Sequence, residues 1–221
     1  MPQGVIFDVD GTIIDSVDEH ARAWQEAFAH FGHDVPFEAI RAQIGKGGDQ
    51  LMPVFLSGDE LQRFGKELNG YRAHLFKRKY LEGLCAFPCV RPLFQRITTH
   101  GMRIALASSA KADELETYKQ KAQVADLLEA ETSSDDAERS KPHPDIFKAV
   151  LDRLGLPPRE AIVVGDSPYD AEAAGKLGLA TVGVLCGGFP EADLRKAGCV
   201  AIYADPADLL RRFEDSPLVR C

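Results

Sequence analysis

The segment Val5-Ile6-Phe7-Asp8-Val9-Asp10-Gly11-Thr12 constrains the fold more than any other, because an apolar run ends in two carboxylates two residues apart. Alternate residues of a strand point to the same face, so Asp8 and Asp10 are expected to leave the strand together. Gly11 lets the backbone turn immediately afterwards. Ligands bind at the carboxyl ends of strands in open α/β sheets, which makes both acids candidate functional residues.

The rest of the chain divides into two patterns. Residues 16–85 show helical signals and no convincing strand, beginning with apolar residues three to four apart (Val17, Ala21, Trp24, Phe28 and Phe31) after a Ser16–Glu19 capping-box spacing. A glycine-rich loop at 45–48 and a long polar helix at 59–80 follow. From Phe87 onward, short apolar runs alternate with expected helices at 92–101, 144–155 and 168–178, which indicates a parallel sheet.

We therefore predict an α/β fold, with a doubly wound, Rossmann-like parallel sheet as its core. The core is expected to comprise residues 1–15 and 86–221, and an inserted α-helical cap is expected at 16–85. Two crossings between core and cap would provide a hinge.

Composition restricts the classes of function. A net charge of −8 disfavours a broad nucleic-acid footprint, which needs clustered Lys and Arg. No apolar window is long enough to span a membrane and no signal segment begins the chain, so no membrane partner is expected. Five scattered cysteines indicate reduced thiols and a cytoplasmic location. The sequence leaves the oligomeric state open, with a monomer favoured.

The first segment, read as FDxDGT, resembles the haloacid dehalogenase-like superfamily of phosphohydrolases. Three further motifs follow in the order that the resemblance requires. An apolar run ends in Ser108-Ser109, Lys141 opens Lys-Pro-His-Pro, and another apolar run ends in the Gly165–Asp170 loop, which has the GDxxxD form. Four ordered motifs are far more specific than a lone DxD pair.

Phosphate chemistry gives each acid a task. A carboxylate that attacks a phosphoryl group needs a cation and fixed donors around the phosphoryl oxygens. Asp8 is the candidate nucleophile, forming an aspartyl-phosphate, and Asp10 is the candidate general acid and base. Mg²⁺ is the expected cofactor. The resemblance implies that Asp8, the Asp10 carbonyl and Asp166 ligate it, with Asp170 bracing the loop behind them; a structural helix-start role for Asp170 is equally open.

The remaining candidates hold the substrate. Ser108 and Lys141 are expected to bind the transferring phosphoryl group, with Ser109 as a further donor; Ser108 is also a candidate helix cap. His20 and Lys46, from the expected cap, are candidate substrate contacts. The alternative role for His20 is packing between helices, and the alternative for Lys46 is that of a solvent-exposed loop lysine.

These expectations combine into a magnesium-dependent phosphatase acting on a small phosphorylated metabolite, similar to phosphoglycolate phosphatase-type enzymes or acting on sugar phosphates. A mutase resembling β-phosphoglucomutase is the alternative, although Gly48 and Gly165 depart from the mutase pattern. Asp10 argues against dehalogenation. A non-catalytic phospho-accepting or regulatory protein is the alternative of another class; a receiver domain has a different motif order.

Overall fold

The core of the computed structural model, which describes residues 2–220, is a six-stranded sheet in the order β5-β4-β1-β6-β7-β8. All its strand pairs are parallel. The strands are β1 (Gly4–Phe7), β4 (Arg103–Ala107), β5 (Ala130–Thr132), β6 (Ala161–Gly165), β7 (Ala180–Val184) and β8 (Cys199–Tyr203). This arrangement confirms the predicted doubly wound α/β fold.

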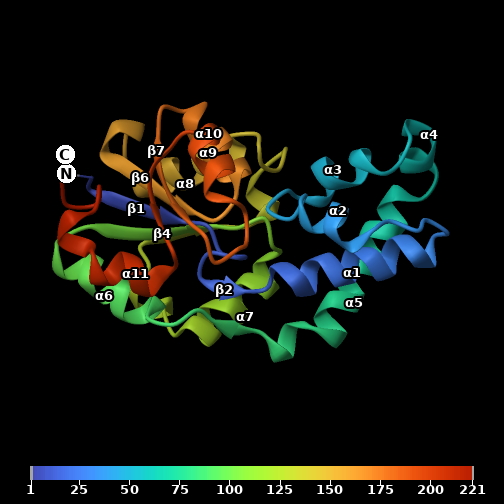
Figure 1. Ribbon diagram of the computed structural model, residues 1–221, viewed down its shortest axis with the longest axis horizontal. Coiled ribbons are helices and arrows are strands. Elements are labelled where there is room, and N and C mark those ends of the chain that lie inside the picture. Colours follow the sequence, from blue (N-terminus) through green and yellow to red (C-terminus); the bar gives the residue numbers. More distant parts are fainter. Residues whose placement is uncertain (1, 221) are drawn as a thin grey trace.

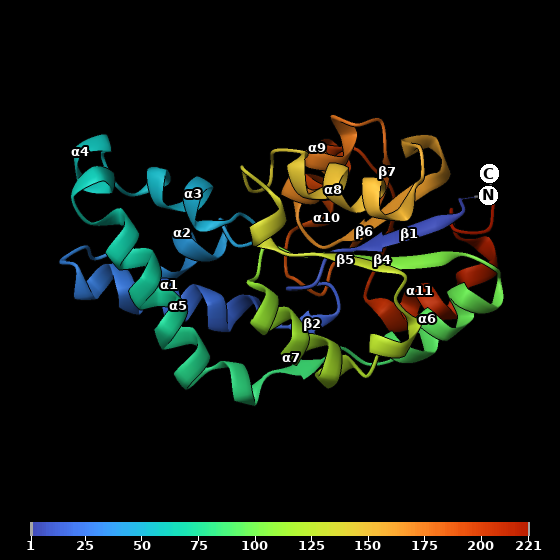
Figure 2. The same cartoon turned by 180° about the vertical axis from the view of Figure 1, so that it is seen from behind.

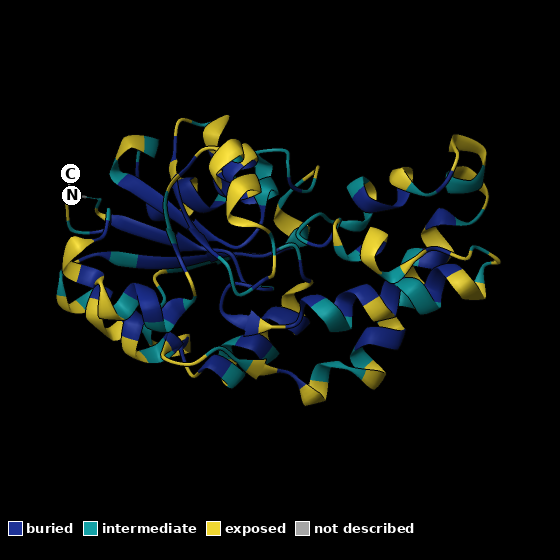
Figure 3. Cartoon of the chain, viewed as in Figure 1, coloured by how far each residue is buried: buried dark blue, intermediate teal, exposed yellow. Residues whose placement is uncertain are grey.

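Helices cover both faces of the sheet, and the residues of β1 show why. Val5 and Phe7 point to the face covered by α6 (Val90–Thr99), α7 (Ala112–Ala122) and α11 (Pro206–Arg211). Ile6 points to the opposite face, against α8 (Asp145–Leu154) and α9 (Pro168–Gly175). Because both faces of the sheet are covered, the central strands β1 and β6 are buried along their whole length instead of alternating, and Figure 3 shows the middle of the sheet as buried.

The helices of residues 17–79 gather at one end of the molecule, away from both termini (Figures 1 and 2). They are α1 (Val17–His30), α2 (Phe37–Arg41), α3 (Gly48–Leu51), α4 (Gly58–Glu60) and α5 (Lys66–Lys79). Trp24 and Phe28 are buried in a separate apolar cluster there. These helices therefore have their own small core.

A two-stranded antiparallel ribbon lies where the chain passes between this group of helices and the sheet. β2 (Ile14–Asp15) pairs with β3 (Cys85–Ala86). The ribbon therefore places side by side the two chain segments that were predicted to connect the core and the cap. The domain boundaries at 16 and 85 stay a prediction.

The helix boundaries differ from the sequence expectations in three places. The expected 59–80 helix contains a wider turn at Leu61–Gly65 between α4 and α5. α6 begins at Val90, two residues before Pro92, and α9 ends at Gly175. The remaining helix, α10, covers Glu191–Ala197. Within residues 2–220, no helix is both long and apolar enough to cross a membrane.

The predicted capping box at Ser16 is wrong. Ser16 is the residue before α1, but its side chain makes no capping hydrogen bond. Its hydroxyl instead donates to Asp10 Oδ1 at 2.7 Å. A tertiary contact has replaced the local one that the sequence indicated.

Candidate active site

Three candidate residues meet where the strand order reverses. β4 and β5 extend the sheet on one side of β1, and β6 to β8 extend it on the other. Such a switch point opens a crevice at the carboxyl ends of the strands. Asp8 follows β1, Ser108 follows β4 and Asp166 follows β6. The Thr12 hydroxyl connects two of them, at 3.3 Å from Asp8 Oδ2 and 3.1 Å from Asp166 Oδ1.

Lys141 is buried among the carboxylates of this crevice. Its Nζ donates to Asp8 Oδ1 and forms an ion pair with Asp170 Oδ1 at 2.8 Å. Burial alone would lower the pKa of Lys141, but the carboxylates of Asp170 and Asp8 raise it above its usual value. Lys141 is therefore a fixed positive charge beside the candidate nucleophile.

The acids themselves favour a bound cation. Burial raises the pKa of Asp8 to about 7, against the attraction of Lys141. Burial, and then the repulsion of Asp8 and Asp170, raises the pKa of Asp166 well above its usual value. One carboxylate oxygen from each of these three acids lies within 4.8 Å of the others. Mg²⁺ prefers such hard oxygen ligands and would relieve the repulsion, so the donor set fits this ion.

Asp170 also has structural partners. Its Oδ2 accepts hydrogen bonds from the backbone N–H of Ser167 at 3.1 Å and from the Ser167 hydroxyl at 2.7 Å. These bonds close a capping box at the start of α9, and the other oxygen is paired with Lys141. Asp170 thus fixes the loop that carries Asp166, whichever role it has toward a metal.

The Asp10 carboxylate is held at the side of the crevice. It accepts hydrogen bonds from Ser16 and from His20, whose Nε2 lies 2.9 Å from Asp10 Oδ1. The Tyr118 hydroxyl lies 3.3 Å from the same His20 nitrogen, and His20 stacks on Phe76. Burial would raise the pKa of Asp10, but the nearby His20 and Ser16 lower it below its usual value. His20 is therefore a partner of Asp10 in this structure.

The two serines after β4 differ in their surroundings. Ser108 is fully buried, and its hydroxyl accepts the backbone N–H of Ala110 at 3.0 Å. The capping alternative for Ser108 is wrong, because α7 begins at Ala112 and its N-cap residue is Lys111. Ser109 lines the cavity above Asp8 and Asp10. Of the two side chains, that of Ser109 is the more accessible to a substrate.

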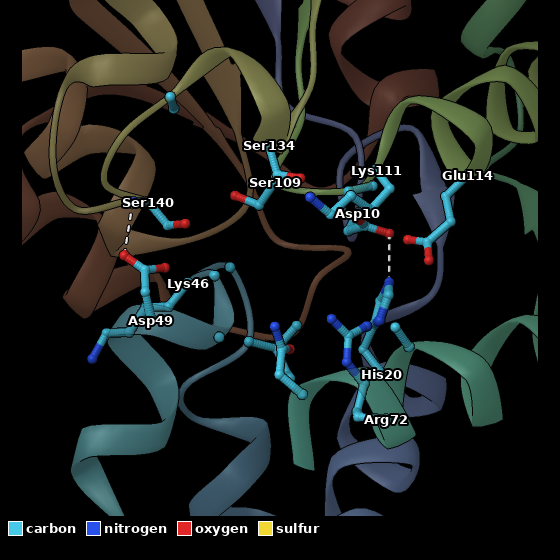
Figure 4. Close-up of a pocket in the computed structure, with 18 of the residues that line it drawn as sticks. Asp10, His20, Lys46, Asp49, Arg72, Ser109, Lys111, Glu114, Ser134 and Ser140 are labelled. Atoms are coloured by element: carbon cyan, nitrogen blue, oxygen red, sulfur yellow. Dashed lines mark hydrogen bonds and ion pairs between the residues drawn. The ribbon is translucent and has the colours of Figure 1, made fainter. Parts of the chain in front are cut away.

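A cavity of about 290 Å³ lies between the carboxyl end of the sheet and the helices of residues 17–79. Figure 4 shows its two sides, with Asp10, Ser109, Lys111 and Glu114 on one and His20, Lys46, Asp49 and Arg72 on the other. The start of α3, next to the loop that carries Lys46, contacts the core directly, because Asp49 Oδ2 accepts the Ser140 backbone N–H at 3.1 Å.

Lys46 lines the cavity from this loop. Its Nζ donates to Gln43 Oε1 at 2.6 Å and lies 4.5 Å from the centre of the Tyr169 ring. Burial lowers the pKa of Lys46. These contacts hold the ammonium group at the cavity wall rather than in bulk solvent.

Two glycines allow the chain to pass close to Asp166. Gly11 has φ +81°, and a Cβ there would lie 2.5 Å from Asp166 Oδ2. A Cβ on Gly187 would lie 1.7 Å from the same oxygen. A larger residue at either position would displace the carboxylate.

Several site residues were not among the sequence candidates. Thr12 is the last residue of the FDxDGT motif, and its fixed position in that motif could have identified it as a site residue. Ser16 was interpreted as a helix cap. Arg72 and Glu114 had no signal, because a charged residue in a polar helix is usually exposed, and only the packing of α5 and α7 turns them inward.

Comparisons with known proteins agree with this geometry. Residues 5–184 match the model of the haloacid dehalogenase-like hydrolase family. A phosphoglycolate phosphatase from Yersinia pseudotuberculosis is 30% identical over 194 residues, covering 84% of this chain and 82% of the relative.

Solved structures have the same fold. A hydrolase from Pseudomonas syringae has a TM-score of 0.87 at 27% identity, covering 97% of this chain and 99% of that one. A Bacteroides vulgatus protein provisionally described as a β-phosphoglucomutase has a TM-score of 0.83 at 19% identity, covering 96% and 88%. The chain therefore belongs to the haloacid dehalogenase-like hydrolase family and is an enzyme, with phosphatases among its curated relatives.

Proposed function

We propose that this enzyme is a magnesium-dependent phosphatase that hydrolyses small phosphomonoesters through an aspartyl-phosphate on Asp8. The observation that carries the proposal is the buried arrangement of Asp8, Lys141, Asp166 and Asp170 at the base of the cavity. It combines a nucleophile, a fixed positive charge and a set of oxygen ligands. Asp8, Asp166 and the Asp10 carbonyl are the proposed ligands, and bound Mg²⁺ would supply positive charge to the phosphoryl oxygens.

In the first step, an Asp8 carboxylate oxygen attacks phosphorus and the bond from phosphorus to the ester oxygen breaks. Lys141 offsets the negative charge between the nucleophile and the phosphoryl group. The departing alkoxide takes a proton from Asp10. Because the pKa of Asp10 is lowered, His20, 2.9 Å away, is well placed to share that proton.

In the second step, a water molecule attacks the phosphorus of the aspartyl-phosphate and Asp10 accepts its proton. The bond between phosphorus and the Asp8 oxygen breaks, which restores the carboxylate. The lowered pKa of Asp10 favours this step, because it keeps the base deprotonated. Ser109 and Lys46, on the cavity wall, are proposed substrate contacts.

A sugar-phosphate mutase is less well supported. The mutase pattern has an arginine where this chain has Gly48, and a Cβ there would meet Asn69 Oδ1 at 2.8 Å and Trp24 at 3.1 Å. The loop therefore has little space for that side chain. A regulatory role without turnover is also less well supported, because the chain has the candidate nucleophile Asp8, the candidate base Asp10 and the positive charge of Lys141.

The test is release of inorganic phosphate from a panel of phosphomonoesters, with Mg²⁺ or with a chelator. The proposal expects repeated turnover that stops when the metal is removed. Conversion of a hexose 1-phosphate into its 6-phosphate without phosphate release would favour the mutase. One phosphate incorporated per chain without turnover would favour a phospho-accepting role.

A small phosphorylated metabolite is the proposed partner. Cys85, Cys89, Cys186 and Cys199 are free thiols, which is compatible with the reducing cytoplasm that the sequence predicts.

A further inference from the structure

Four buried polar atoms of residues that line the cavity have no hydrogen-bond partner within residues 2–220. They are Asn69 Oδ1 and Arg72 Nε on α5, Glu114 Oε1 on α7, and Ser134 Oγ just after β5. Asn69 and Arg72 are three residues apart on one helix and so share a face. Buried polar groups are usually paired, and an unpaired one costs about 1–3 kcal/mol. Four such atoms around one cavity are points at which a bound molecule can donate or accept a hydrogen bond, and the three on α5 and α7 come from facing helices.

The contacts of Glu114 leave it available to a ligand. The residue is 2% exposed, and the nearest cation is Lys77, whose Nζ lies 3.8 Å from Glu114 Oε1. This separation is too long for a hydrogen bond, and Lys77 instead donates to Asp113 at 2.6 Å. Figure 4 shows the Glu114 side chain directed from α7 into the cavity. Its carboxylate can therefore accept a hydrogen bond from a bound molecule.

Arg72 balances the charge of Glu114 without forming an ion pair within hydrogen-bond distance among the described residues. The centre of its guanidinium lies 4.9 Å from the centre of the Trp24 ring, which is within the distance of a cation–π contact. Burial lowers the pKa of Arg72 and raises that of Glu114, and each charge partly offsets the shift of the other. This end of the cavity therefore presents one positive and one negative group, with no net charge from the two together.

The unpaired atoms discriminate between leaving groups. Glu114 Oε1 is an acceptor, Asn69 Oδ1 is an acceptor as placed, and Arg72 Nε is a donor. A hydroxyl group can donate to either acceptor and accept from Arg72. A carboxylate can only accept, so next to Glu114 it would leave that acceptor unpaired and meet a like charge. The cavity volume of about 290 Å³, roughly that of ten liquid water molecules, leaves room for several carbons beside a phosphoryl group.

We propose that Asn69, Arg72 and Glu114 form a leaving-group subsite that binds the hydroxyl groups of a sugar or polyol phosphate in preference to the carboxylate of phosphoglycolate. The proposal rests on the phosphatase function above, and it assigns the substrate class within it. The subsite acts on binding, so its loss should raise KM more than it lowers kcat.

The experiment measures kcat/KM for hexose 6-phosphates, glycerol 3-phosphate and phosphoglycolate, with p-nitrophenyl phosphate as an ester that lacks aliphatic hydroxyls. We expect the native chain to prefer at least one sugar or polyol phosphate over phosphoglycolate by tenfold or more. Glu114→Gln should reduce that ratio roughly tenfold, mainly through KM. Arg72→Lys, which keeps the charge but removes the Nε donor, should also reduce it.

The matched control is Glu116→Gln, because Glu116 is on the same helix but exposed. It should leave the ratio unchanged. Each ratio is internal to one preparation, so a partly folded variant still gives a valid value. Preference of the native chain for phosphoglycolate, or an unchanged ratio in both subsite variants, would overturn the subsite while the phosphatase function stands. No phosphate release from any ester would overturn both.

Discussion

Two groups of polar residues in the cavity differ in how their charges are paired. In the carboxylate cluster (Asp8, Lys141, Asp166 and Asp170), Lys141 is ion-paired with Asp8 and Asp170, and Asp8 and Asp166 directly follow buried strands. In the leaving-group subsite (Asn69, Arg72 and Glu114), buried atoms lack partners and the side chains come from two helices. The difference teaches that the cluster takes its partners from the protein and the proposed metal, whereas the subsite takes its partners from the substrate. The first suits chemistry common to all phosphomonoesters, and the second suits selection among them.

The largest expected effect is that of Asp8→Asn. Removing the nucleophile should reduce turnover of every ester by at least about 10³-fold, because the aspartyl-phosphate can then no longer form. Steady-state phosphate release measures this. Asp59→Asn, an exposed acid on α4, is the control and should retain native rates. Residual turnover within tenfold of native would show that another group attacks phosphorus.

Lys141→Met should have the largest effect on stability. It leaves Asp8 and Asp170 buried without their cation, and breaking such a pair costs about 3–5 kcal/mol. Urea denaturation at pH 8 with a chelator would measure the free energy of unfolding, and added Mg²⁺ should recover part of the loss. Lys196→Met, at an exposed position, is the control. A loss below about 1 kcal/mol would contradict the assigned charge balance.

Magnesium affinity should depend on pH. The metal binds the deprotonated carboxylate, and the pKa of Asp8 in the metal-free protein is raised to about 7. A proton therefore competes with the ion increasingly as pH falls through 7. Titration calorimetry should show affinity about tenfold weaker at pH 6 than at pH 8, with proton release on binding near pH 7. Equal affinity at both values would show that Asp8 is already ionised without the metal.

Ser16→Ala should have the smallest of these effects, and it separates a site role from a capping role. Because the Ser16 hydroxyl donates to Asp10, its loss should lower kcat a few-fold for all esters alike. Ser57→Ala is the matched control, since Ser57 forms a true capping box with Glu60. That variant should lose about 1 kcal/mol of stability at unchanged kcat. Unchanged kcat in Ser16→Ala would show that Asp10 does not need this donor.

The sequence predicted the sheet and family because their signals are local. A buried apolar strand followed by acids can be recognised without knowing its neighbours, and the doubly wound fold and the family are confirmed. The roles of individual site residues and the extent of the cap stay predictions. The structure does place Asp8, Lys141 and Asp166 together, as the motif order indicated.

The sequence could not predict the subsite, because it depends on how helices rotate. Arg72 and Glu114 are ordinary charged residues of polar helices, and only tertiary packing buries them. The prediction of a capping box at Ser16 was wrong for the same reason. The spacing to Glu19 fits a capping box, but the Ser16 hydroxyl donates to Asp10 instead. The spacing of residues along a chain shows which local hydrogen bonds a side chain can form. It does not show whether a distant residue will be the partner instead.

The most direct test of the division between chemistry and selection is a substrate profile of two variants, Asp10→Asn and Arg72→Gln, over the same panel of esters. The account predicts that Asp10→Asn lowers kcat for the alkyl phosphates by a common factor and leaves their order of preference unchanged. Arg72→Gln should change that order, with the largest rise in KM for the most hydroxylated esters. Two results would contradict this division of roles. One is that Arg72→Gln lowers the activity toward all esters by the same factor, and the other is that Asp10→Asn changes their order of preference.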